Sequence, residues 1–110
     1  MTAVTTHVLD TALGRPATGV PVRLERLDAA MTTIAEGATD DDGRVRKLGP
    51  GHLEPGPYRL SFDTDAYFAA IGTTGFFPEV AIAFTITDVG EHYHVPLLLS
   101  PFSYSTYRGS

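Results

Sequence analysis

Three of the four histidines have a spacing suited to proton-transfer chemistry. His92 and His94 are one residue apart in a run that alternates like a β-strand, so their imidazoles share one face. His7 lies in a second strand-like run near the start of the chain. A neutral imidazole is the natural general base at physiological pH. The sequence thus offers three candidate bases and leaves open which of them takes the proton first.

Two arginines could complement such a base by holding an oxygen-rich substrate. Arg44 directly follows the turn Asp40-Asp41-Asp42-Gly43, and Arg108 lies in the C-terminal tail. A guanidinium offers forked hydrogen bonds to oxygen atoms. The chain has no cysteine and no serine elbow, so we do not expect a covalent acyl-enzyme.

A metal site is the alternative use of the histidine pair. Two imidazoles at this spacing can converge on a zinc ion, and His7 or an aspartate could be the third ligand. The full ligand set is not visible in the sequence. The aspartate-rich turn is not a calcium loop, because Ala38 and Gly49 stand where that loop needs acidic ligands. We therefore expect no metal and no other cofactor.

The run that carries the histidine pair, residues 92–99, is apolar on both faces, unlike a solvated edge strand. We expect it to be covered by its own core on one side and by another subunit on the other. The tail that follows is rich in aromatic residues and also contains Arg108. Aromatic and arginine side chains are costly to leave in solvent and useful in contacts. A frayed end is one interpretation; we favour a tail that docks and completes a site.

The rest of the chain predicts short strands joined by turns. Gly, Pro and Asp separate alternating runs, and Asp63-Thr64-Asp65 can cap a short helix that Gly72 ends. This pattern favours an all-β antiparallel sandwich with one short helix. The expected strands are 4–11, 20–25, 32–39, 58–63, 80–87 and 92–99, and the expected helix is 66–71.

Composition limits the possible functions. The 110 residues, 43% of them apolar, suit one domain spanning 1–110. The net charge is −5 and no basic stripe is present, so we expect no nucleic-acid binding. No apolar run reaches membrane-spanning length, and no secretory signal is visible. With no cysteine in the chain, we expect a cytoplasmic protein without a membrane partner.

Six segments of the chain form a set of motifs. They are THVLD (6–10), GRPA (14–17), DGR (42–44), FFPE (76–79), EHYHVPLLLSP (91–101) and YRGS (107–110), and the two C-terminal motifs are long and specific. Together they resemble one family, the 5-hydroxyisourate hydrolases among the transthyretin-related proteins. The resemblance runs from about residue 4 to the last residue.

The resemblance implies a transthyretin-like sandwich of two four-stranded sheets, assembled as a homotetramer that is a dimer of dimers. It implies hydrolysis of the N1–C6 amide of 5-hydroxyisourate, giving 2-oxo-4-hydroxy-4-carboxy-5-ureidoimidazoline during the degradation of urate to allantoin. It also places the active site in the cleft where the dimers meet. The residues implied for this site are His7, Arg44, His94, Tyr107, Arg108, Gly109 and Ser110.

The sequence leaves two other functions open. A transthyretin-like carrier of a small hydrophobic ligand would share the fold and the central channel, but would be expected to lack the polar groups at His7, Arg44 and His94. A zinc-dependent hydrolase would use the pair His92 and His94, and treatment with a chelator would distinguish it. The sequence does not reveal whether His92 has a direct role.

Overall fold

The structure is a computed structural model that describes residues 2–109. Its strands are β1 (Val4–Asp10), β2 (Arg15–Pro16), β3 (Pro21–Arg26), β4 (Thr32–Ala38), β5 (Arg44–Val45), β6 (Gly56–Phe62), β7 (Val80–Ile86), β8 (Tyr93–Leu99) and β9 (Tyr104–Thr106), and its helix is α1 (Thr64–Ala70). The helix in this part of the chain is not long and apolar enough to cross a membrane.

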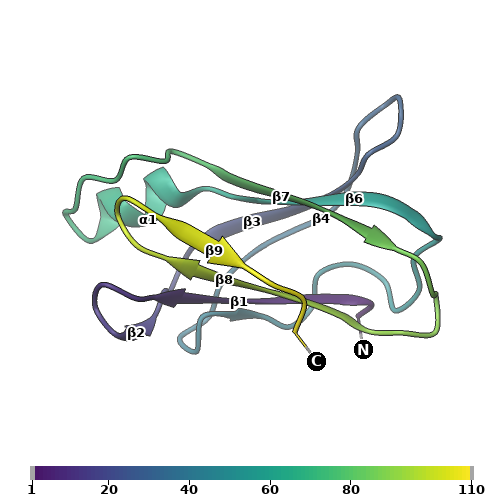
Figure 1. The fold of residues 1–110 in the computed structure, drawn as a ribbon, viewed down its shortest axis with the longest axis horizontal. Coiled ribbons are helices and arrows are strands. Elements are labelled where there is room, and N and C mark those ends of the chain that lie inside the picture. The colour runs from purple at the N-terminus through teal and green to yellow at the C-terminus, as the bar shows by residue number, and fades with distance from the viewer. Residues whose placement is uncertain (1, 110) are drawn as a thin grey trace.

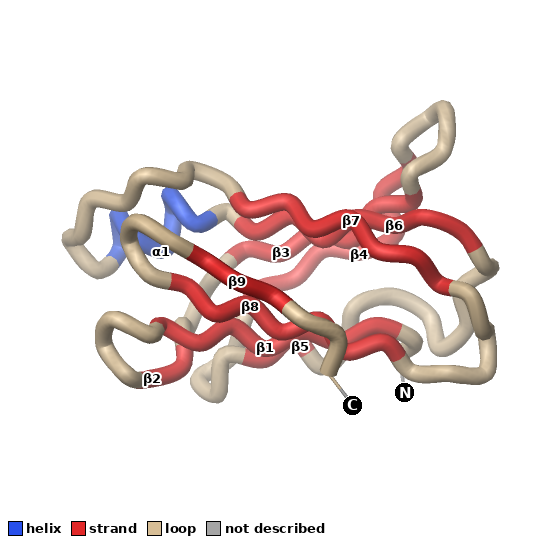
Figure 2. The backbone as a smooth tube through the Cα atoms, in the orientation of Figure 1, coloured by secondary structure: helices blue, strands red, loops and turns tan. Residues whose placement is uncertain are grey.

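The strands form two sheets packed face to face, as Figures 1 and 2 show. One sheet has the order β4-β3-β6-β7, and the other has the order β2-β1-β8-β9 with β5 also paired to β1. The expected sandwich with one short helix is confirmed. The second sheet gains a fifth strand because the two-residue strands β2 and β5 pair with different parts of β1. The pairing of β1 with β8 is parallel, which a purely antiparallel sandwich would not contain.

Alternation along β1 and β8 separates the core from the outer face of their sheet. In β1, Val4, Thr6, Val8 and Asp10 are buried while the residues between them are half-buried. In β8, the inward-pointing residues Tyr93, Val95, Leu97 and Leu99 are all buried. Each strand therefore buries one row of side chains between the sheets and leaves the other row, with His7 and His94, on the outer face.

A buried hydrogen bond ties the helix to the end of β1. The Tyr67 hydroxyl of α1 donates to Asp10 Oδ2 over 2.6 Å. Burial, with Asp10 alongside, raises the pKa of Tyr67, so the hydroxyl keeps its proton and remains a donor. At the start of the helix, Asp63 accepts from the Ala66 backbone N–H, which confirms the expected cap.

The C-terminal tail contains a strand that the sequence did not predict. Tyr104–Thr106 forms β9, which pairs with the end of β8, and Gly109 forms an isolated bridge with His94. The tail therefore runs back along β8 as the edge of the sheet instead of ending beyond it (Figure 1).

Candidate active site

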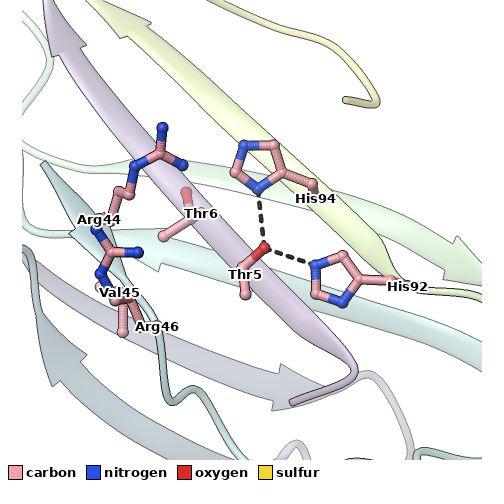
Figure 3. Close-up of a pocket in the computed structure, with 7 residues that line it drawn as sticks. All are labelled: Thr5, Thr6, Arg44, Val45, Arg46, His92 and His94. Carbon is pink, nitrogen blue, oxygen red and sulfur yellow. Dashed lines mark hydrogen bonds between the residues drawn. The ribbon is translucent and has the colours of Figure 1, made fainter. Parts of the chain in front are cut away.

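Two of the expected site residues, Arg44 and His94, line a pocket of about 400 Å³ on the outer face of the β1–β8 sheet. β1 occupies the centre, with β5 on one side and β8 on the other. The register places Thr5 opposite His94 and His7 opposite Arg44. Figure 3 shows the lining residues, which are Thr5, Thr6, Arg44, Val45, Arg46, His92 and His94.

The Thr5 hydroxyl lies between the two histidines of β8 and its preceding turn. Its oxygen is 2.8 Å from Nε2 of His92 and 2.8 Å from Nδ1 of His94. The far side of His92 is held as well, because its Nδ1 lies 3.0 Å from the carbonyl oxygen of Thr2. Sequence reasoning missed Thr5. Its signal was the period-2 alternation that puts it on the same face of β1 as His7.

His94 is held as a neutral imidazole. Burial lowers its pKa below the ordinary value of 6.5, and the positive charge of Arg44 adds to this effect, as would a proton on His7 or His92, while a hydrogen bond with the Thr5 backbone opposes it. Figure 3 shows the second ring nitrogen of His94 turned away from Thr5, on the side of the Arg44 guanidinium. A neutral ring with a nitrogen facing a guanidinium across a pocket can accept a proton next to a developing negative charge.

The turn before β5 presents Arg44 to β1. Asp40 Oδ1 accepts from the backbone N–H groups of Asp42 and Arg44, and these bonds, that of Arg44 first, lower the Asp40 pKa. Gly43 has a φ of 77°, and a Cβ there would collide with the Val8 carbonyl oxygen. Asp40 and Gly43 therefore allow the turn to pack closely against β1 and to place Arg44 beside it.

His7 lies beside the pocket and is also oriented by this turn. Its Nε2 is 2.8 Å from the carbonyl oxygen of Asp42, which can only accept, so this nitrogen carries the proton. In the neutral ring, Nδ1 is then an acceptor.

The tail reaches the site through Gly109. Its N–H donates to the His94 carbonyl oxygen over 2.8 Å, and a Cβ at this position would lie 2.6 Å from His94 Cδ2. Only a glycine allows the backbone to pass so close to the imidazole.

Arg108 and Tyr107 do not line the pocket within this chain. The Arg108 guanidinium stacks 4.4 Å from the centre of the Tyr93 ring and pairs with Glu91 at 3.2 Å. Tyr107 is exposed and borders a separate groove between β7 and β9. The expected site residue Ser110 lies outside the described residues. Arg108 therefore clamps the tail to β8, and this clamp holds Gly109 against His94.

A third metal ligand does not join the histidine pair in the described part of the chain. Among residues 2–109, no group of three or more His, Cys, Asp or Glu side chains is arranged to hold a metal ion. The lining of the pocket instead contains two histidines and two arginines, of which Arg46 is paired with Asp40 and Asp42.

Comparison with known proteins gives this site a context. The chain is 50% identical to a 5-hydroxyisourate hydrolase from Mus musculus, over 97% of its own length and 94% of the relative's. Among solved structures, it resembles the 5-hydroxyisourate hydrolase of Klebsiella pneumoniae with a TM-score of 0.88 and 38% identity, covering 100% of this chain and 94% of the other. It also resembles the transthyretin of Sparus aurata, with a TM-score of 0.92 and 34% identity over 99% and 97% of the two chains.

The family model described as "HIUase/Transthyretin family" matches residues 4–109, nearly the whole described chain. Together with relatives of such identity and coverage, this match shows that the chain belongs to the HIUase/transthyretin family.

Proposed function

We propose that this protein hydrolyses 5-hydroxyisourate at its N1–C6 amide bond, giving 2-oxo-4-hydroxy-4-carboxy-5-ureidoimidazoline. The observation that carries the proposal is His94, a half-buried imidazole with a lowered pKa in one pocket with Arg44. The relatives named 5-hydroxyisourate hydrolase support the choice of substrate. The reaction would follow urate oxidation and precede allantoin formation, and we place it in the cytoplasm.

The reaction needs a base for water and a positive charge for the carbonyl oxygen. In the proposed mechanism, His94 takes a proton from water as the water oxygen bonds to C6. Arg44 stabilises the negative charge that develops on the carbonyl oxygen. The N1–C6 bond then breaks, and the proton held by His94 passes to N1, so that one water is consumed and the base is regenerated. We assign His7, which is paired with Arg44 between β1 and β5, to substrate binding and keep it as the alternative base.

A carrier function is less well supported by the same pocket. Its lining includes two histidines and two arginines, which would be costly to desolvate against an apolar ligand. One of the similar solved structures is a sea bream transthyretin in complex with thyroxine, at 34% identity. The likeness to transthyretins extends to the fold, while the polar groups of the pocket favour hydrolysis.

The first test is turnover of freshly generated 5-hydroxyisourate, followed by ultraviolet absorbance above its unaided decay. His94→Ala should lower kcat by about 10²–10⁴-fold, the usual contribution of a positioned base. His52→Ala is the matched control, since His52 is exposed and contacts Glu54 away from the pocket. Full activity of His94→Ala would refute the assignment of the base. Loss of activity in chelator, restored by zinc, would favour the metal mechanism instead.

The pH dependence should reflect the lowered pKa of His94. Because the base acts in its neutral form, kcat should fall as pH drops through this pKa, at a pH below 6.5. Arg44→Gln removes a neighbouring positive charge, so NMR titration should show the His94 pKa move upward. It should stay below 6.5, because burial is the larger cause. A wild-type midpoint above 6.5 would contradict this account of the site.

Removing the tail should cost activity and little stability. Deleting residues 107–110 removes the Arg108 clamp and the Gly109 contact with His94, but leaves β9 in place. We expect kcat to fall about 10²-fold through loss of positioning, with the thermal midpoint nearly unchanged. In the full-length chain, Gly109→Ala should have a similar effect and Gly90→Ala should not, because the added Cβ at Gly90 lies 3.3 Å from Asp88 Oδ1, away from His94. An active truncated protein would show that the tail is dispensable.

We also propose that the chain assembles as a homotetramer, a dimer of dimers with the pocket at the cleft between dimers. The tail exposes the large rings of Phe102, Tyr104 and Tyr107 within six residues of the sequence, and exposed apolar surface of this kind supports an interaction surface. In such an assembly, Tyr107 and Ser110 remain proposed substrate contacts. Sedimentation velocity should report a tetramer at micromolar concentration, and a monomer would contradict both the assembly and the location of the site.

A further inference from the structure

Hydrogen bonds join His92, Thr5 and His94 in an unbroken series (Figure 3), and this series begins at the backbone of Thr2. Each of the three contacts is between 2.8 and 3.0 Å. The carbonyl oxygen of Thr2, at the start of this series of hydrogen bonds, determines which atom donates the proton in each of them.

The Thr2 carbonyl oxygen has no proton, so it can only accept. Nδ1 of His92 must therefore be the donor in their 3.0 Å contact. A neutral imidazole carries one N–H, which leaves Nε2 of His92 with a lone pair. The Thr5 hydroxyl, 2.8 Å away, must then donate its only proton to that lone pair.

The same hydroxyl can now act only as an acceptor toward His94. Nδ1 of His94, also 2.8 Å from the Thr5 oxygen, must supply the proton of that bond. The lone pair of neutral His94 is therefore on Nε2, the nitrogen turned toward Arg44 in Figure 3. The opposite proton order would set the His92 Nδ1 lone pair against the Thr2 carbonyl oxygen at 3.0 Å, which is repulsive.

We propose that Thr5 and His92 are positioning residues that hold His94 in the tautomer protonated on Nδ1, so that its Nε2 is the base. This inference rests on the proposed function for its consequence in catalysis, but the tautomer is a property of the free protein. Without the chain of bonds, a free imidazole prefers its proton on Nε2, where it would block proton transfer from water. The order of donors thus converts a strand histidine into an oriented base, as the partner of a catalytic histidine does in hydrolytic triads.

The test reads the tautomer directly, by long-range ¹⁵N–¹H NMR correlation on histidine-labelled protein without substrate. Wild-type His94 should show a protonated Nδ1 and an unprotonated Nε2. Thr5→Val, which keeps the shape and loses the hydroxyl, should shift His94 toward the Nε2–H form, and His92→Leu should do the same. Thr5→Ser restores the hydroxyl and should restore the wild-type tautomer. Thr33→Val is the matched control, an exposed threonine on β4 of the other sheet.

Kinetics provide the second readout. Thr5→Val should lower kcat about 10²-fold, the scale of a lost positioning contact, with KM little changed, and Thr5→Ser should recover most of the rate. His94 found with its proton on Nε2 in the wild type would overturn the proposal, as would an unchanged tautomer in Thr5→Val. A wild-type protein with the expected tautomer but no turnover of 5-hydroxyisourate would refute the proposed function and leave the assignment of the proton intact.

Discussion

The parallel pairing of β1 with β8 is the contact on which the site depends. It joins segments about 90 residues apart in sequence and places Thr5 directly opposite His94. Because side chains alternate along a strand, a slip of one residue would turn His94 toward a different neighbour and exchange the core and outer faces of β8. The buried row from Tyr93 to Leu99 prevents such a slip, since it would move apolar side chains out of the core.

The short strand β5 depends on the same central strand. β1 has one edge occupied by β8, and its other edge is divided between β2 and β5. This division leaves room for a turn whose Asp40 accepts two backbone N–H groups and whose Gly43 packs against β1. The turn brings a fixed positive charge next to His94, where it both lowers the pKa of the imidazole and is available to a developing anion. The position of Arg44 thus serves two roles in the proposed reaction: it keeps His94 neutral, and it can stabilise the negative charge on the carbonyl oxygen.

Two adjacent residues of the tail take different roles. Tyr107 and Arg108 are adjacent, yet Arg108 is used by its own chain, on the ring of Tyr93 and the carboxylate of Glu91, while Tyr107 remains exposed. The exposed ion pair between Arg108 and Glu91 contributes little stability alone. Combined with stacking on an aromatic ring and the Gly109 bridge, it orients the backbone beside His94. The arginine expected to bind substrate is, within one chain, part of the support for the base.

The long strands, the start of the helix and several candidate site residues could be predicted from the sequence. Alternation marked the long strands, Asp63 marked the start of the helix, and the family motifs indicated His7, Arg44 and His94 as candidate site residues, because these signals are local or are carried by specific residue types. Thr5, the clamp role of Arg108, the strand β9 and the parallel β1–β8 pairing were not accessible in this way. Each depends on which distant segment lies alongside, and a hydroxyl gives no hint of its partners until the register of two strands is set. The residue types thus specified the available chemistry, while the fold selected the nitrogen of His94 that can perform it, because the burial and hydrogen-bond partners of an imidazole come from the strands packed around it.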